Sequence, residues 1–177
     1  MDDIYWCKAH YLDASALVKL VADDSDEEPG RDVLREYYWR HIASVYATSY
    51  CITETLSAFK GKHQRGRITQ DQYIKYVRDF TLRIIGGNLR EDEVPILNPL
   101  VLTEAERLMR KHKIDFLDCF QILTIMHGHF HVLGPHSKSL LITADQGLAR
   151  AARAEGVRVW ECTSEPSPRL LELDVSA

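Results

Sequence analysis

The 177-residue sequence lacks the features that mark several large classes of protein. No apolar run approaches the roughly 20 residues of a membrane-spanning helix, and the opening MDDIYWCKAH has neither the basic start nor the apolar stretch of a secretory signal. The four cysteines are scattered and form no CxxC pair, which argues against a zinc ribbon, a redox motif or a disulfide framework. We therefore expect a cytoplasmic protein with no membrane segment.

The local motifs of several enzyme classes are also missing. The sequence contains no GxSxG elbow and no GxGxxG or GxxxxGK[ST] loop, so a serine hydrolase and the common nucleotide-binding folds are unsupported. A formal net charge of −4 argues against a strongly basic coat for nucleic acid. Local basic runs remain at residues 60–67 and 107–113, and each is equally typical of a solvated helix end.

Short apolar segments alternate along the chain with longer helical patterns. Buried strands are expected at residues 10–14, 41–47, 139–143 and 157–160. Helices are expected at residues 31–40, 49–60, 69–85, 99–112, 116–127 and 145–155. This alternation predicts one α/β domain over residues 1–177, built as a three-layer α/β/α sandwich around a mostly parallel sheet. Cys51 and Cys119 lie within apolar patterns and are expected in its core.

Residues with helix-end preferences stand at several of these boundaries. Ser15 and Ser49 are candidate N-caps, and Thr69 is followed by Asp71 and Gln72 in a favourable first turn. Asn98, before Pro99, is expected to cap the start of the helix at 99–112, and Gly156 is expected to end the helix at 145–155. Residues 22–30 and 86–95 look like loops, and the connection over 86–98 is long and acidic.

Two aspartates follow apolar strands directly. Asp13 closes the strand at 10–14, and Asp145 follows the strand at 139–143 with Thr143 two residues earlier. In parallel sheets, sites form where the carboxyl ends of the strands share an edge, which would bring these side chains together. Each aspartate could equally be a simple helix cap, because strand-to-helix junctions favour that residue.

Acidic residues also occur within two of the expected helices. Glu54 lies beside apolar neighbours, and Asp118 stands one turn into the apolar helix at 116–127, with Asp115 three residues earlier as the better N-cap. An unpaired, buried carboxylate is costly or acquires a raised pKa, and a bound cation removes that cost. Hard oxygen ligands select Mg²⁺ or Mn²⁺, and such a site suits water activation for attack on a phosphodiester.

Four sequence blocks in order strengthen this interpretation: YLDASALVKL, TSYCITETLSA, IDFLDCFQI and LLITADQGLARAARAEGVRVW. Their order and spacing resemble the PIN domain family and, more narrowly, the toxin nucleases of VapBC toxin–antitoxin pairs. The resemblance covers roughly residues 9–160, which leaves residues 161–177 as a C-terminal tail, and it implies a PIN-like fold.

The resemblance implies a catalytic quartet at Asp13, Glu54, Asp118 and Asp145. It further implies that Asp13, Asp118 and Asp145 hold one or two Mg²⁺ or Mn²⁺ ions for RNA cleavage, with Thr143 and Ser15 as supporting hydroxyls and Asp115 nearby. Cys119 stands where alanine is commoner in the family. The basic residues expected to follow an RNA backbone are Lys60, Lys62 and Arg65.

The function that this resemblance implies is an endoribonuclease that acts as the toxin of a type II pair and is silenced by a protein antitoxin. Alternatives are a stand-alone PIN-like nuclease in RNA processing and a PIN-like scaffold that binds RNA or protein without cutting. A homodimer is also expected from the family, and the aromatic segment 35–41 fits either its interface or the core. Four nearby histidines favour an exposed surface over a metal site: His127, His129, His131 and His136.

Overall fold

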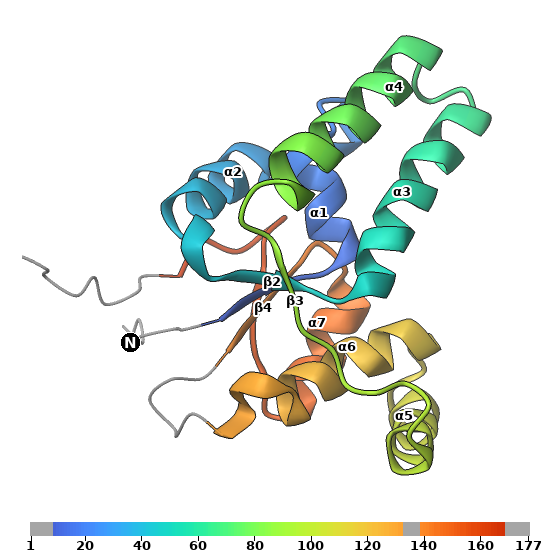
Figure 1. Ribbon diagram of the computed structural model, residues 1–177, viewed down its shortest axis with the longest axis vertical. Helices are drawn as coiled ribbons and strands as arrows, with labels where there is room; N and C mark the ends of the chain where they lie inside the picture. The colour runs from blue at the N-terminus through green and yellow to red at the C-terminus, as the bar shows by residue number, and fades with distance from the viewer. Residues whose placement is uncertain (1–8, 133–138, 169–177) are drawn as a thin grey trace, which may run out of the picture.

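A five-stranded, wholly parallel sheet in the order β3-β2-β1-β4-β5 forms the centre of the molecule (Figure 1). The structure, a computed structural model, describes residues 9–132 and 139–168. The strands are β1 (His10–Leu12), β2 (Val45–Ala47), β3 (Arg90–Glu91), β4 (Leu140–Thr143) and β5 (Arg158–Glu161). The main helices are α1 (Ala14–Val21), α2 (Arg31–Arg40), α3 (Ser49–Gln64), α4 (Gln70–Asp79), α5 (Pro99–His112), α6 (Phe116–His127) and α7 (Gln146–Ala154). The predicted α/β/α sandwich is confirmed.

Two separate cores follow from the alternation of side chains along the strands. Leu12 and Ile142 face a core made with α1, α2, α3 and α4, whereas Tyr11 and Leu141 face one made with α5, α6 and α7. Figure 1 shows these two helical layers above and below the sheet. Because both faces are covered, the central strands consist of buried residues.

Several strand boundaries differ from the sequence-based predictions. The segment 41–47 contains a strand only at Val45–Ala47, and Ile42–Ser44 forms a short 3-10 helix, η2. Strand β3 lies inside the segment predicted as a loop, and both of its residues are exposed. Because β3 has no apolar alternation, the sequence offers no signal for it. The predicted strand at 157–160 is β5, displaced by one residue.

The helix caps agree with the sequence at some boundaries and differ at others. Thr69 forms a capping box with Gln72, and Asn98 caps α5, as predicted. The predictions for Ser49 and Ser15 were wrong: Thr48 caps α3 and Asp13 caps α1. Thr48 lies one residue before Ser49 and Asp13 two residues before Ser15, and each has an extended backbone and accepts amide hydrogen bonding through its side chain. Helix α3 also continues to Gln64, and the predicted helix at 69–85 ends in a π-helical segment, η3 (Phe80–Ile85).

The aromatic segment 35–41 is mainly a core element. Tyr37 and Tyr38 are buried, whereas Trp39 is 54% exposed. Cys51 and Cys119 are buried with free thiols, as predicted. Among the described residues, no helix is long and apolar enough to cross a membrane.

The strand order positions a site at the centre of the sheet. From β1 the chain proceeds to β2 and β3 on one side, and the later strands β4 and β5 extend the sheet on the other side. After β1 the chain enters α1 on one face, and after β4 it enters α7 on the opposite face. Parallel sheets bind ligands at such a switch point, beyond the carboxyl ends of the strands. Asp13 and Asp145 stand at this position.

Candidate active site

Asp13 is a buried carboxylate at the end of β1 that is held from several directions. Its Oδ1 accepts hydrogen bonds from the amide of Ser15 and from the amide of Ala16, the latter at 3.1 Å, which caps α1. Its Oδ2 accepts from the hydroxyls of Ser15, at 3.1 Å, and Thr143. Burial raises the pKa of Asp13, and the hydrogen bonds from Thr143 and Ser15 oppose that rise. The helix-cap interpretation is therefore correct, and the carboxylate also lines a pocket.

Ser15 and Thr143 join the ends of the two central strands. Thr143 Oγ1 accepts the amide of Asp145 at 2.9 Å, and its hydroxyl donates to Asp13. Ser15 Oγ accepts the amide of Ala144 at 2.8 Å. Since each hydroxyl accepts an amide from the β4 end and donates toward Asp13, the network fixes where that carboxylate lies. The predicted supporting hydroxyls are thus beside the acid that they were expected to support.

Asp145 provides the second carboxylate at the sheet edge. Its Oδ1 accepts the amides of Gly147 at 2.5 Å and Leu148 at 2.9 Å, so it caps α7. Unlike Asp13, Asp145 is exposed. Its position at the N-terminus of α7 favours negative charge, because the helix macrodipole is positive there.

Asp115 and Asp118 have different roles at the start of α6. Asp115 is the N-cap, as predicted, and its Oδ1 accepts the amide of Asp118 at 2.8 Å. Asp118 is half-buried within the first helical turn. Burial, followed by the negative charges of Asp115, Asp13, Asp145 and Glu54, raises the pKa of Asp118 to about 7. This carboxyl therefore experiences the combined field of the other acids.

Glu54 approaches the same place from α3, where its side chain is exposed. Burial and then the charges of Asp115, Asp13 and Asp145 raise its pKa. All the predicted acids meet in one pocket of about 90 Å³, whose carboxylate lining is Asp13, Glu54, Asp115, Asp118 and Asp145. We call it the acidic pocket. A concave site with mutually perturbed carboxyls is a candidate active site.

Sequence reasoning missed Gln121 in the wall of the acidic pocket. Its side chain is buried, and its Oε1 accepts from Thr48 Oγ1 at 3.3 Å and Cys51 Sγ at 3.1 Å. Its amide nitrogen has no hydrogen-bond partner among the described residues. The available signal was a polar residue three positions after Asp118, inside an apolar helix, where burial demands a partner.

One of the three predicted RNA-binding residues is committed to the fold. Lys62 is buried, and its Nζ lies 2.8 Å from Asp24 Oδ1 and 2.8 Å from Glu27 Oε1. The expectation that Lys62 follows an RNA backbone is therefore corrected, because its ammonium neutralises the acidic segment after α1. Lys60 and Arg65 are exposed.

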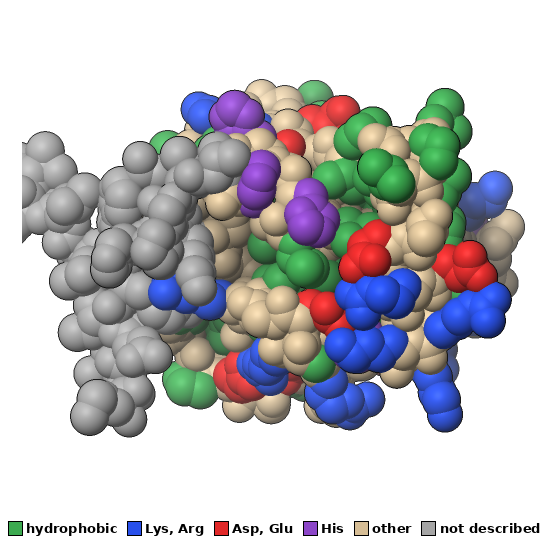
Figure 2. Space-filling view, turned by 90° about the horizontal axis from the view of Figure 1, so that it is seen from below, with side chains coloured by type: hydrophobic (Ala, Val, Ile, Leu, Met, Phe, Trp, Pro, Cys, Tyr) green, Lys and Arg blue, Asp and Glu red, His purple; other side chains and the backbone are tan. Residues whose placement is uncertain are grey.

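The histidine segment gives no support for a second metal site. His127, His129 and His131 are exposed, and His136 lies outside the described residues. Figure 2, viewed from the side of α5, α6 and α7, shows histidine side chains on the surface of this layer. Across residues 9–132 and 139–168, no group of three or more His, Cys, Asp or Glu side chains is arranged to hold a metal ion directly.

Comparison with known proteins agrees with this fold. Residues 10–154 match the family model of the PIN domain. The chain belongs to the PIN domain family. No curated protein sequence matches it. Among solved structures, it is similar to the one entitled "Crystal structure of PAE2754 from Pyrobaculum aerophilum". The TM-score is 0.53 and the sequence identity 17%, and the match covers 85% of this chain and 83% of that one. At that identity, the likeness supports the fold alone.

PIN domains are generally nucleases that use divalent metal ions, so the donor set of the acidic pocket can be tested against that chemistry. Its carboxylate oxygens are the donors that Mg²⁺ and Mn²⁺ prefer. Burial and then the neighbouring carboxylates raise the pKa of Asp118, and a bound cation would favour its charged form. Mg²⁺ commonly keeps several waters and is bound through only one or two carboxylates, so a direct cage of three ligands is not required. The residues of this PIN domain therefore fit a hard divalent cation.

Proposed function

We propose that this PIN domain is a metal-dependent endoribonuclease whose active site is the acidic pocket. Asp13, Asp118 and Asp145 would hold Mg²⁺ or Mn²⁺, directly or through water, and Glu54 would orient the attacking water. The observation that carries the proposal is the convergence of these carboxylates, with Asp115, on one pocket at the switch point of the sheet. Such mutually repelling acids are costly to the fold and useful to phosphodiester chemistry.

Each acid contributes something different to the proposed reaction. Asp13 keeps its charge in a fixed place because amides and hydroxyls hold both of its oxygens, and preorganised charge needs no rearrangement during the reaction. Burial and then the neighbouring carboxylates raise the pKa of Asp118 to about 7, so its charged form would gain most from a bound cation. Glu54 is exposed and has a raised pKa, which suits a group that accepts a proton from water. A bound divalent cation would supply Lewis-acid activation and charge neutralisation at the phosphodiester.

Helix α3 also carries two exposed basic residues for the substrate. Lys60 and Arg65 follow Glu54 on this helix and just beyond its end. Lys60 lies six residues after Glu54, which corresponds to about 9 Å along the helix axis. We propose that these exposed cations contact phosphates of the RNA strand, a contact that carries little sequence information.

A cleavage assay with Asp13→Asn tests this proposal. Asparagine is an equally good N-cap, so the fold should persist while the charge is lost. We expect metal-dependent cleavage of single-stranded RNA by the wild-type protein, no detectable cleavage by Asp13→Asn, and full cleavage by Asp71→Asn, which alters an exposed residue of α4. Full activity of Asp13→Asn would overturn the assignment. If the wild-type protein cut no RNA with Mg²⁺ or Mn²⁺, the non-catalytic scaffold would be favoured.

We also propose that the nuclease acts as a toxin that a protein antitoxin silences. The four sequence blocks that resemble VapBC toxins support this role. Production of the wild-type protein in a bacterial host should arrest growth, and Asp13→Asn should not. Growth that is unaffected by an active, folded nuclease would favour the stand-alone enzyme instead. Homodimer formation is a further expectation, and sedimentation of the purified protein tests it.

A further inference from the structure

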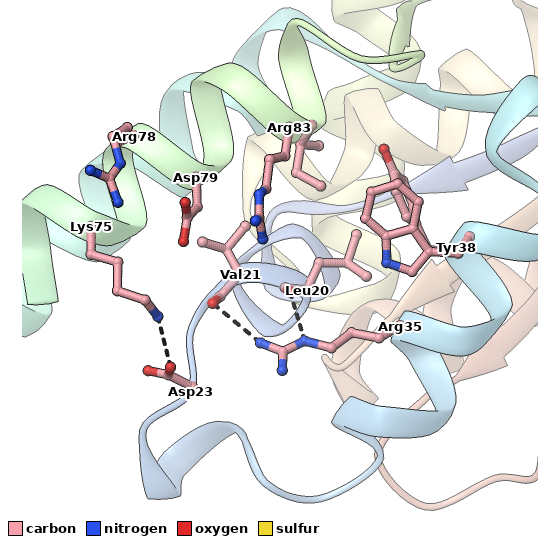
Figure 3. Close-up of a pocket in the computed structure, with 11 residues that line it drawn as sticks. Leu20, Val21, Asp23, Arg35, Tyr38, Lys75, Arg78, Asp79 and Arg83 are labelled. Atoms are coloured by element: carbon pink, nitrogen blue, oxygen red, sulfur yellow. Dashed lines mark hydrogen bonds and ion pairs between the residues drawn. The ribbon is translucent and has the colours of Figure 1, made fainter.

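A second pocket lies at the opposite end of α1 from the acidic pocket. It has a volume of about 420 Å³ and opens between the end of α1, α2, α4 and η3 (Figure 3). Its lining consists of Leu20, Val21, Asp23, Arg35, Tyr38, Trp39, Lys75, Arg78, Asp79, Arg83 and Ile84. We call it the basic pocket. A volume of this size lies within the range of pockets that hold small ligands.

Positive charge predominates in the basic pocket. Four basic side chains and two carboxylates give a formal charge of +2, in a chain whose net charge is −4. Two of the cations already serve the fold. Arg35 donates to the carbonyls of Leu20 at 2.8 Å and Val21 at 3.2 Å, and Lys75 lies 2.8 Å from Asp23. Figure 3 shows both contacts at one side of the pocket.

The other two cations, Arg78 and Arg83, are not used within the described part of the chain. Neither guanidinium makes an ion pair or a hydrogen bond there, and Figure 3 shows both side chains on the side of the helix that lines the pocket, with Asp79 drawn between them. The π-helical segment explains why they share a face. In η3 the Gly86 amide bonds the Thr81 carbonyl, five residues back. A π turn holds more residues than an α turn, so the chain from Arg78 in α4 to Arg83 in η3 brings these two positions closer to a common side than a regular α-helix would.

Aromatic side chains form the wall that faces these arginines. Tyr38 and Trp39 contact each other edge to face, with ring centroids 5.3 Å apart. Trp39 is 54% exposed, although large apolar side chains are usually covered. The Tyr38 hydroxyl is buried and has no hydrogen-bond partner among the described residues. The pocket therefore offers an exposed indole and two cations that have no partner among the described residues.

We propose that the basic pocket binds one nucleotide unit of a single-stranded nucleic acid, with its phosphate between Arg78 and Arg83 and its base against Trp39. Guanidinium groups bind phosphate oxygens in pairs, and bases stack on aromatic rings. A phosphate alone would leave the aromatic wall unused. An acidic peptide would satisfy the arginines, but the pocket offers no strand edge to bind its backbone, since it is built from helices.

The choice of RNA as the strand rests on the proposed function. Helix α1 has eight residues, so its ends are about 12 Å apart at 1.5 Å per residue. The acidic pocket is at its N-terminus and the basic pocket at its C-terminus. A strand of a few nucleotides covers this distance at about 3.4 Å per nucleotide. The basic pocket would then hold RNA a few nucleotides away from the cleaved bond.

Binding can be measured without cleavage. The full-length protein in excess EDTA is titrated with adenosine monophosphate, with a six-nucleotide RNA, with adenosine and with inorganic phosphate, by calorimetry and tryptophan fluorescence. We expect both nucleotide ligands to bind more tightly than adenosine or phosphate. The Arg78→Gln/Arg83→Gln variant should weaken binding by about tenfold or more, since two charge-assisted hydrogen-bonding groups are lost. Trp39→Phe should remove most of the fluorescence change.

Matched controls separate the pocket from general charge effects. Arg150→Gln removes one exposed arginine on α7, across the sheet, and should bind nucleotides like the wild-type protein. Melting temperatures establish that each variant is folded, and if the double variant is not, Arg83→Gln alone replaces it. Unchanged binding by the folded arginine variant would overturn the proposal. So would equal binding of phosphate and adenosine monophosphate, or binding of an acidic peptide in preference to both nucleotide ligands.

The outcome does not depend on the nuclease assignment. If nucleotides bind in EDTA through Arg78 and Arg83 but no RNA is cut with metal, the proposed function fails and the binding site remains. If RNA is cut but the arginine variant binds and cleaves RNA as the wild-type protein does, the proposed nucleotide site is refuted and the proposed nuclease function stands. A free nucleotide as the natural ligand would appear as tight binding of adenosine monophosphate with no gain for the oligonucleotide.

Discussion

The two ends of α1 carry opposite charges. At its N-terminus Asp13 caps the helix and lines the acidic pocket, whereas at its C-terminus Arg35 bonds the last carbonyls and lines the basic pocket. Both arrangements follow the helix macrodipole, which favours anions at the first turn and cations at the last. One short helix thereby holds one charged residue of each pocket.

The two pockets differ in how the fold uses their charges. In the acidic pocket the carboxyls repel one another, and the pKa values of Asp118, Glu54 and Asp13 are raised by burial and, for the first two, by their neighbours. Of the four cations in the basic pocket, Arg35 and Lys75 are paired within the structure. The side chains of Arg78 and Arg83 have no hydrogen-bond or ion-pair partner among the described residues. The acidic pocket is therefore the stronger indication of function, because its charge has a cost that the fold does not offset.

The largest expected effect separates the two neighbouring acids of α6. Asp118→Asn should reduce metal-dependent RNA cleavage by about 10³-fold or more, because metal-bound charge stabilisation contributes several kcal/mol. Asp115→Asn retains an N-cap and removes an exposed charge, so it should reduce cleavage by less than about tenfold. Cleavage rates at saturating Mg²⁺ provide the measurement. Equal losses of cleavage rate in the two variants would show that Asp118 is no more important for cleavage than the N-cap Asp115.

A second prediction separates a structural cation from a surface one. Lys62→Met should lower the free energy of unfolding by about 3 kcal/mol, because it leaves the largely buried Asp24 unpaired and leaves Glu27 with Lys19 alone. Lys60→Met, on the same helix but exposed, should stay within about 0.5 kcal/mol. Denaturant unfolding of both variants gives the comparison. If the Lys62→Met protein were as stable as Lys60→Met, the ion pairs of Lys62 would not stabilise the fold, and RNA binding would again be the better role for this residue.

The smallest predicted effect concerns the pH dependence of stability in the metal-free protein. Asp118 has a pKa of about 7 in the folded protein, against an ordinary value of 3.8. Between these values the unfolded chain loses a proton that the folded protein keeps, so the free energy of unfolding falls as pH rises from about 4 to about 7. Because the carboxyl is partly solvated, we expect about 1 to 2 kcal/mol rather than the full shift.

Asp118→Asn is the control for this prediction, because asparagine does not titrate. Unfolding free energies in EDTA at pH 4.5 and pH 8 should differ less for the variant than for the wild-type protein. An identical pH dependence in the two proteins would mean that Asp118 ionises normally and that the acids do not act on one another.

Features that depend on local sequence were predictable. Asp13 and Asp145 follow apolar strands, so their place at one sheet edge follows from the parallel topology. The N-cap role of Asp115 also follows from its position before the apolar helix. The local sequence did not decide between cap and pocket for Asp13, and the structure shows that the residue serves as both.

Features that depend on distant contacts were not predictable. Lys62 belongs to a basic run in the sequence, and its burial depends on the acidic segment after α1 that folds against it. The basic pocket combines residues from α1, α2, α4 and η3, and the π turn that places Arg83 has no sequence signal. Strand β3 was missed because its two residues are exposed and polar.

Metal binding to the acidic pocket is the most direct test of the central claim. Mn²⁺ or Mg²⁺ is titrated by calorimetry into the metal-free protein at pH 8, where Asp118 is ionised, and the melting temperature is recorded with and without metal. The account predicts saturable binding and a raised melting temperature for the wild-type protein, both lost in Asp118→Asn and both weaker at pH 6, where protons compete for the carboxyl. No saturable binding, or binding unchanged in Asp118→Asn, would contradict it.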